Sequence, residues 1–170
     1  MRYAGIIDND LTGGPGLSVT VFVQGCPHRC PSCYNEHTWD FNGGFEVYEN
    51  FIEDILNKLN KNNINRRLCI MGGEPLCKEN ISLTNTIVKE VRKKSPNTEI
   101  AIWTGYCYEN LIEEARQVLK DVDVLVDGPF ILEQKDLTLA MRGSRNQRII
   151  DIQKTLKSNS IVLKKEYYEI

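Results

Sequence analysis

The sequence predicts an α/β protein, with a parallel sheet and helices outside it. Short runs of β-branched and other apolar residues alternate with segments of roughly 10–15 residues whose apolar side chains recur at helical spacing. This alternation is typical of successive β-α-β units. Four of the expected strands are also followed directly by segments rich in Gly, Cys, Thr, Glu or Asp. This pattern favours a functional site where the carboxyl ends of the strands meet.

The first strand and the first helix are predicted from different periodicities. Residues 17–24 are a strand because three valines alternate with other β-prone residues, and the Gly-rich segment 13–16 before it is a loop. Residues 48–61 are a helix because their apolar residues share one face. The residues expected on that face are Phe51, Ile52, Ile55, Leu56 and Leu59.

The middle of the chain continues as strand, helix and strand. Residues 68–71 form a short apolar run that ends in two glycines, which indicates a buried strand, and residues 99–103 form the next strand. Between them lies a helix with Ser82 as its N-cap and three basic residues that complement the dipole at its C-terminal end. Its expected inward residues are Leu83, Ile87, Val88 and Val91.

The last predicted elements are a helix over 108–120, a strand over 122–126, and weaker strand candidates at 148–151 and 161–163. The inward residues expected in that helix are Leu111, Ile112, Ala115, Val118 and Leu119. No repeat, low-complexity tract or Pro/Ser-rich linker divides the sequence, so we expect one domain over residues 1–170.

Composition narrows the class of protein. A net charge of −2 argues against a general nucleic-acid binder, which needs a basic surplus for phosphate contacts. No apolar run is long enough for a membrane span, and the N-terminus lacks the zones of a signal peptide, so we expect a cytoplasmic protein. Thiols stay reduced there, and six cysteines therefore favour metal binding or redox chemistry over disulfides.

Cys26, Cys30 and Cys33 are the strongest candidate for a site. Gaps of three and two residues let one loop wrap its thiolates around a small inorganic cluster, and Pro27 and Pro31 disfavour a helix there. A [4Fe–4S] cluster usually takes four thiolates. Three would leave one iron free to bind a substrate, which would make the cluster a catalytic centre.

Other interpretations of these residues remain open. His37 could complete a four-ligand zinc site with the three thiolates, or the 30–33 segment could be a thioredoxin-like redox pair that leaves Cys26 without a role. The three cysteines could also share a loop by chance. The isolated cysteines are interpreted as structural; they are Cys69, Cys77 and Cys107.

The cysteine loop resembles the Cys-x3-Cys-x2-Cys signature of the radical S-adenosylmethionine superfamily. Within it, the ordered set of motifs is similar to the family of activating proteins of anaerobic ribonucleoside-triphosphate reductases. Ser32 departs from the pattern, because the superfamily often has an aromatic residue there and this family often has glycine. The matching segments are 14–16, 26–30, 33–35, 38–40, 72–76, 103–106, 127–130 and 142–148.

The resemblance implies a partial, open βα barrel with one [4Fe–4S] cluster on Cys26, Cys30 and Cys33 at its rim. The cluster would reductively cleave S-adenosylmethionine to methionine and a 5′-deoxyadenosyl radical, and that radical would take a hydrogen atom from a glycine of the reductase large subunit. A reducing protein such as flavodoxin would supply the electron. The variant interpretations are an activase of another glycyl-radical enzyme, such as pyruvate formate-lyase, and a non-catalytic zinc-binding interaction domain.

The resemblance also implies which residues meet S-adenosylmethionine. They are Ser32, Cys33, Tyr34, Gly72, Gly73 and Glu74. Two glycines at a strand end allow a ligand close to the backbone, and Glu74 could accept hydrogen bonds from the methionine ammonium. On its own, the Gly-Gly-Glu segment would be interpreted as a strand-end turn, and Tyr34 could simply pack in the core.

Several polar residues keep two interpretations each. Thr104 and Asp127 follow predicted strands and either line the cavity or cap turns. His28 lies between two candidate ligands, and it either supports those ligands without binding the metal or faces a partner protein. The basic segment 141–165 is either a solvated face or a docking surface for the reductase, with its three arginines as candidates for contact. Those arginines are Arg142, Arg145 and Arg148.

Overall fold

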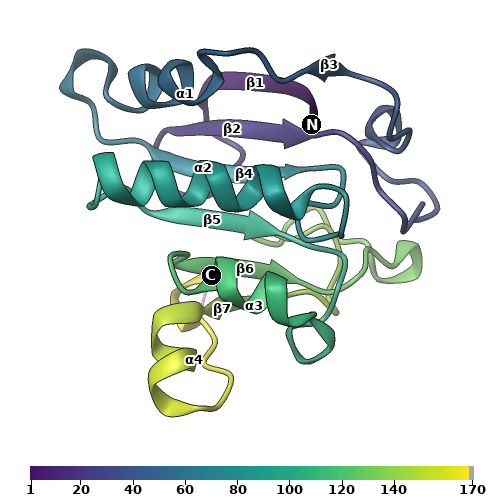
Figure 1. Cartoon of the computed structure of the whole chain (residues 1–170). Helices are drawn as coiled ribbons and strands as arrows, with labels where there is room; N and C mark the ends of the chain where they lie inside the picture. The colour runs from purple at the N-terminus through teal and green to yellow at the C-terminus, as the bar shows by residue number, and fades with distance from the viewer. Residues whose placement is uncertain (169–170) are drawn as a thin grey trace.

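The computed structural model describes residues 1–168, whose strands form one seven-stranded sheet in the order β3-β1-β2-β4-β5-β6-β7 (Figure 1). The strands are β1 Arg2–Asp10, β2 Ser18–Val23, β3 Phe45–Glu46, β4 Arg67–Gly72, β5 Ile100–Trp103, β6 Val124–Asp127 and β7 Arg148–Asp151. The helices are α1 Phe51–Leu59, α2 Ile81–Lys94, α3 Glu113–Leu119 and α4 Ile152–Ser158. Short 3-10 turns lie at Glu36–Thr38, Lys61–Asn63, Tyr108–Asn110, Leu132–Gln134 and Lys165–Tyr167.

The sheet is mixed, so the prediction of a purely parallel sheet is wrong. Strands β2, β4, β5 and β6 run parallel, whereas β1 is antiparallel to β2, β3 to β1, and β7 to β6. The α/β class is confirmed. The sheet is not closed, because β3 and β7 are its two ends. That it forms a partial barrel stays a prediction.

The antiparallel strands follow from how the chain connects them. A parallel neighbour needs a crossover, usually a helix, but β1 leads to β2 through residues 11–17 and β6 leads to β7 through residues 128–147 without an α-helix. Each of these strands therefore starts at the end of the sheet where the previous strand stopped. Strand β1 was not predicted from the sequence, because its second half contains Asp and Asn, which are rare in strands.

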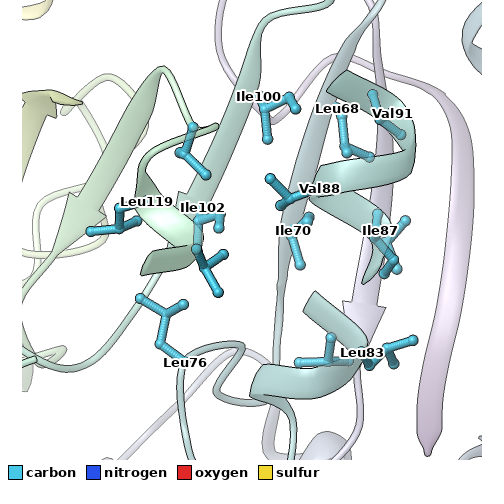
Figure 2. Packing of buried hydrophobic residues seen from close by; sticks show 14 of the residues in the cluster. Leu68, Ile70, Leu76, Leu83, Ile87, Val88, Val91, Ile100, Ile102 and Leu119 are labelled. Carbon is cyan, nitrogen blue, oxygen red and sulfur yellow. The ribbon is translucent and has the colours of Figure 1, made fainter. Parts of the chain in front are cut away.

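Helix α2 covers the centre of the sheet and builds the larger core. Figure 2 shows its side chains directed at those of β4 and β5. The predicted inward residues of this helix are confirmed, since Leu83, Ile87, Val88 and Val91 are buried. Burial of an aliphatic side chain contributes about 1.5–3 kcal/mol, so this layer fixes the strands whose ends carry the site.

Several predicted boundaries are wrong. Ser82 lies inside α2, and Asn80 is the residue that precedes this helix. The helix expected over 108–120 is a 3-10 turn followed by α3, and Ile112 between them has extended backbone and is 48% exposed. Helix α4 was not predicted, and the strand candidate 161–163 makes a single bridge from Leu163 to Ile150.

The four parallel strands bring their carboxyl ends to one edge of the sheet, and the loops that follow them gather there (Figure 1). This edge lies opposite the loops that enter the strands. Within residues 1–168, no helix combines the length and the apolar character needed to span a bilayer.

Candidate iron–sulfur site

Cys26, Cys30 and Cys33 line one open cavity at the carboxyl edge of the sheet. The rest of its wall comes from the segments that follow β4, β5 and β6, including residues 72–74 and 104–105. The sequence predicts that these strand ends share a rim, and the structure brings them together there.

The cysteine loop is closed by main-chain hydrogen bonds between its two ends. The Gly25 N–H donates to the Thr38 carbonyl at 2.7 Å, and the Cys26 N–H donates to the Trp39 carbonyl at 3.1 Å. Between these ends no α-helix forms over residues 26–35, as the two prolines predicted. Arg29 and Ser32 have left-handed backbone, with φ of 48° and 57°, which turns the chain back toward the cavity.

The thiols of this loop are held in different surroundings. Burial raises the pKa of the Cys26 and Cys30 thiols, and nearby backbone N–H groups oppose that rise. The Cys33 sulfur accepts a hydrogen bond from the Asn35 N–H at 3.4 Å. Because metals bind the thiolate form, assembly of a metal centre here must release protons.

The donor set fits a cluster better than a single ion. Within residues 1–168, no group of three His, Cys, Asp or Glu side chains is placed to hold one metal ion. A zinc site gathers four ligands around one ion, whereas a four-iron cluster binds each thiolate at a different iron. Three thiols around one cavity meet the second requirement. His37, the fourth ligand of the zinc interpretation, is exposed and lies outside the cavity lining.

Trp39 indicates that the cavity holds a group with hydrogen-bond acceptors. This residue lines the cavity, and its buried indole N–H has no hydrogen-bond partner among residues 1–168. A buried donor without an acceptor is costly and rare in native proteins. Sulfide and carboxylate are both acceptors that a bound cluster and its ligand would provide.

Glu74 is 1% exposed, and protein groups already surround its carboxylate. Its Oε1 accepts hydrogen bonds from the Leu76 N–H at 2.9 Å and the Thr104 hydroxyl at 2.7 Å. Its Oε2 accepts from the Gly105 N–H at 2.7 Å and from His28 Nε2 at 2.9 Å. A carboxylate has about four acceptor sites, so a ligand ammonium could bond to Glu74 only by displacing one of these donors.

A side chain on Gly72 or Gly73 would collide with β2 or with the residues just after it. A Cβ on Gly73 would lie 2.3 Å from the Gly25 carbonyl oxygen, and one on Gly72, where φ is +100°, would lie 2.8 Å from Phe22 Cβ. Asn80 secures this contact, because its side-chain amide donates to the carbonyls of both Gly25 and Glu74 at 3.0 Å. No local pattern predicts this role of Asn80, because both partners of its amide are main-chain atoms of other segments.

Comparison with known proteins identifies the family. The family model described as "4Fe-4S single cluster domain" matches residues 12–150. The anaerobic ribonucleoside-triphosphate reductase-activating protein of Escherichia coli K12 is 38% identical over 148 residues, which make up 86% of this chain and 96% of that protein. The chain belongs to the family of anaerobic ribonucleoside-triphosphate reductase-activating proteins. Two further relatives with that name come from Vibrio cholerae, at 39% identity over 88% of this chain and 97% of the relative, and from phage T4, at 36% over 88% and 93%.

Of the residues that the resemblance places around S-adenosylmethionine, some line the cavity and others do not. Cys33, Gly72, Gly73 and Glu74 line the cavity, whereas Ser32 and Tyr34 are not among its lining residues. The Tyr34 side chain is 98% exposed, so it does not pack in the core either. The left-handed backbone of Ser32 is a conformation that favours glycine.

The structure also shows where the polar residues lie for which the sequence left two interpretations. Thr104 and His28 both line the cavity, and each forms a hydrogen bond with Glu74. Asp127 is fully buried outside the lining, where it bonds to Arg148 and the Tyr108 N–H. The three isolated cysteines also lie outside the lining, and burial raises the pKa of the Cys69 and Cys77 thiols to about 12.

The three arginines proposed for docking do not form one free surface. Arg148 pairs with Asp127 and Glu109. Arg142 stacks its guanidinium over the Tyr168 ring at 4.2 Å. Arg145 is 73% exposed at its side chain and pairs with Asp136. Of the three, Arg145 is the exposed one, whereas Arg142 and Arg148 are only partly exposed.

Proposed function

We propose that this protein activates an anaerobic ribonucleoside-triphosphate reductase by generating a glycyl radical on that enzyme. One observation carries the proposal: three cysteines line an open cavity at the carboxyl edge of the sheet, in a chain that belongs to the activating-protein family. An open cavity suits a substrate that is a loop of another protein.

Cys26, Cys30 and Cys33 would hold one [4Fe–4S] cluster and leave one iron without a protein ligand. When bound, the cluster supplies the electron that splits S-adenosylmethionine into methionine and a 5′-deoxyadenosyl radical, the species that removes a hydrogen atom from the reductase glycine. A reducing protein such as flavodoxin would deliver that electron.

The remaining residues shape the place where S-adenosylmethionine binds. Cys33, Gly72 and Gly73 line the cavity and would border the cofactor directly. Glu74 would contribute mainly by fixing the wall, because its carboxylate already accepts four hydrogen bonds. Ser32 and Tyr34 would meet only the outer part of the cofactor, since they lie outside the lining.

Activation can be tested by following hydrogen from the reductase to the product. The reconstituted protein, S-adenosylmethionine and a reductant are mixed with reductase that carries Cα-deuterated glycine. We expect a carbon-centred radical on the reductase by electron paramagnetic resonance, and 5′-deoxyadenosine that is one mass unit heavier.

Pyruvate formate-lyase prepared in the same way is the matched comparison. A stronger radical signal on that enzyme would assign the protein to a different glycyl-radical partner. Cleavage of S-adenosylmethionine without deuterium transfer to either enzyme would contradict the proposed activation step.

A further inference from the structure

We propose that His28 fastens the cysteine loop to the cavity wall and thereby positions Cys26 and Cys30 on the cluster. The inference rests on the proposed function, since it assumes that the loop carries a cluster. His28 lines the cavity, and the role assigned to it is that of a positioning residue that acts through the cysteine loop.

The fastening bond runs from His28 to Glu74. His28 Nε2 lies 2.9 Å from Glu74 Oε2, and the two side chains are 19% and 1% exposed. Because a carboxylate only accepts hydrogen bonds, Nε2 carries the hydrogen in this contact. A hydrogen bond to a buried carboxylate is stronger than one between neutral groups.

Glu74 is a fixed anchor for this bond. Its other three donors are the Leu76 N–H, the Thr104 hydroxyl and the Gly105 N–H, which all belong to the segments after β4 and β5. His28 is the one donor among the four that comes from the cysteine loop. The carboxylate therefore joins the loop to two strand ends that lie 46 and more residues away in sequence.

The imidazole also packs into a space that Gly105 leaves free. A Cβ on Gly105 would lie 2.6 Å from His28 Cδ2 and 2.7 Å from His28 Nε2. On another side, the ring meets Tyr106 edge to face, with centroids 4.5 Å apart. Gly105 does not need a left-handed backbone, since its φ lies outside that region, so its missing side chain is explained by the imidazole.

The position of His28 in the loop explains why the contact matters. It is two residues from Cys26 and two residues from Cys30. Main-chain bonds close the loop at Gly25 and Cys26, whereas the span between the two cysteines meets the wall through the His28 side chain. Without that contact, the two thiols would still be present but their separation would no longer be fixed.

The test measures how fast a chelator removes iron from the reconstituted protein under anaerobic conditions. Supporting groups around metal ligands are typically worth about 10–100-fold in metal affinity, so we expect His28→Ala to lose iron at least about tenfold faster than the unmodified protein. His28→Gln, whose amide can still donate to Glu74, should recover most of the difference. His37→Ala, the other histidine of the chain, is the matched control and should leave the rate unchanged.

A double-substitution cycle with Gly105 separates this role from a general effect on folding. Gly105→Ala drives the imidazole from its place and should accelerate iron loss as His28→Ala does. In the His28→Ala background the same alanine meets no ring, so it should add no further effect. Thermal unfolding of the iron-free chains should give similar midpoints for the single variants.

The outcomes distinguish this inference from the function on which it rests. Unmodified protein that binds no cluster would overturn both. If the unmodified protein binds a cluster, two results would overturn the role of His28 alone. One is an unchanged rate of iron loss in His28→Ala, and the other is an effect of Gly105→Ala that persists in full without the imidazole.

Discussion

Replacing Cys26, Cys30 or Cys33 with Ala, one at a time, will abolish the formation of 5′-deoxyadenosine. The three thiols line one cavity, and each would bind a different iron. Loss of a direct ligand should exceed the effect of a supporting residue, so we expect activity to fall by more than about 100-fold. The iron content of each variant and the product formed under reducing conditions measure the two consequences.

Cys107→Ala provides the matched control for these substitutions. Cys107 is also a partly exposed thiol, but it does not line the cavity. Its replacement should leave iron content and product formation unchanged. Any of the three loop variants that kept both would show that its cysteine is not a ligand, and the three-cysteine site would have to be revised.

Replacing Arg148 with Met will lower the free energy of unfolding by about 3–5 kcal/mol, the usual effect of leaving a buried charge without its ionic partner. Arg148 Nε donates to Asp127 Oδ1 at 2.9 Å, and its terminal nitrogens bond to Glu109 at 2.7 and 2.9 Å. Asp127 is fully buried, so the variant leaves its charge uncompensated apart from the Tyr108 N–H. Urea denaturation monitored by circular dichroism measures the change.

Arg145→Met is the control for this prediction. Arg145 is 73% exposed and pairs with Asp136 at the surface, so its loss should change stability by no more than about 0.5 kcal/mol. A loss below about 1 kcal/mol in Arg148→Met, the range of surface pairs, would contradict a structural role for the Arg148 pair.

The second ion pair of Arg148, with Glu109, predicts a dependence of the free energy of unfolding on pH. Hydrogen bonds from Arg148 lower the pKa of Glu109 from 4.5 to about 2. A lowered pKa in the folded state stabilises the protein above the unfolded value, and this contribution disappears as pH falls from 4.5 toward 2. The stability difference between the unmodified protein and Arg148→Met should therefore narrow over that range. Glu109 is half exposed, so this part of the effect is small.

The sequence predicted what depends on local pattern. The spacing of the cysteines selected a loop whose three thiols line one cavity, and apolar patterns identified the inward face of α2 and the four parallel strands. Strand β1 was missed because its polar second half resembles a loop. The direction of β7 was missed because it depends on the path of the long segment 128–147, which connects β6 to β7.

The contacts inside the site depend on segments far apart in the chain, and the sequence therefore could not predict them. His28 had two open interpretations until the structure placed it 2.9 Å from Glu74. Glu74 was expected to face a ligand, yet its carboxylate joins three loops. Asp127 also had two open interpretations, a cavity residue or a turn cap, because nothing local indicated its pairing with Arg148.

The central claim is that the three-cysteine loop carries a cluster that acts on S-adenosylmethionine. The most direct measurement is anaerobic reconstitution with iron and sulfide, followed by reduction in the presence of S-adenosylmethionine. The account predicts a brown protein with about four irons and four sulfides per chain, and 5′-deoxyadenosine and methionine in equal amounts. A colourless protein that binds one zinc ion and forms no 5′-deoxyadenosine would contradict it.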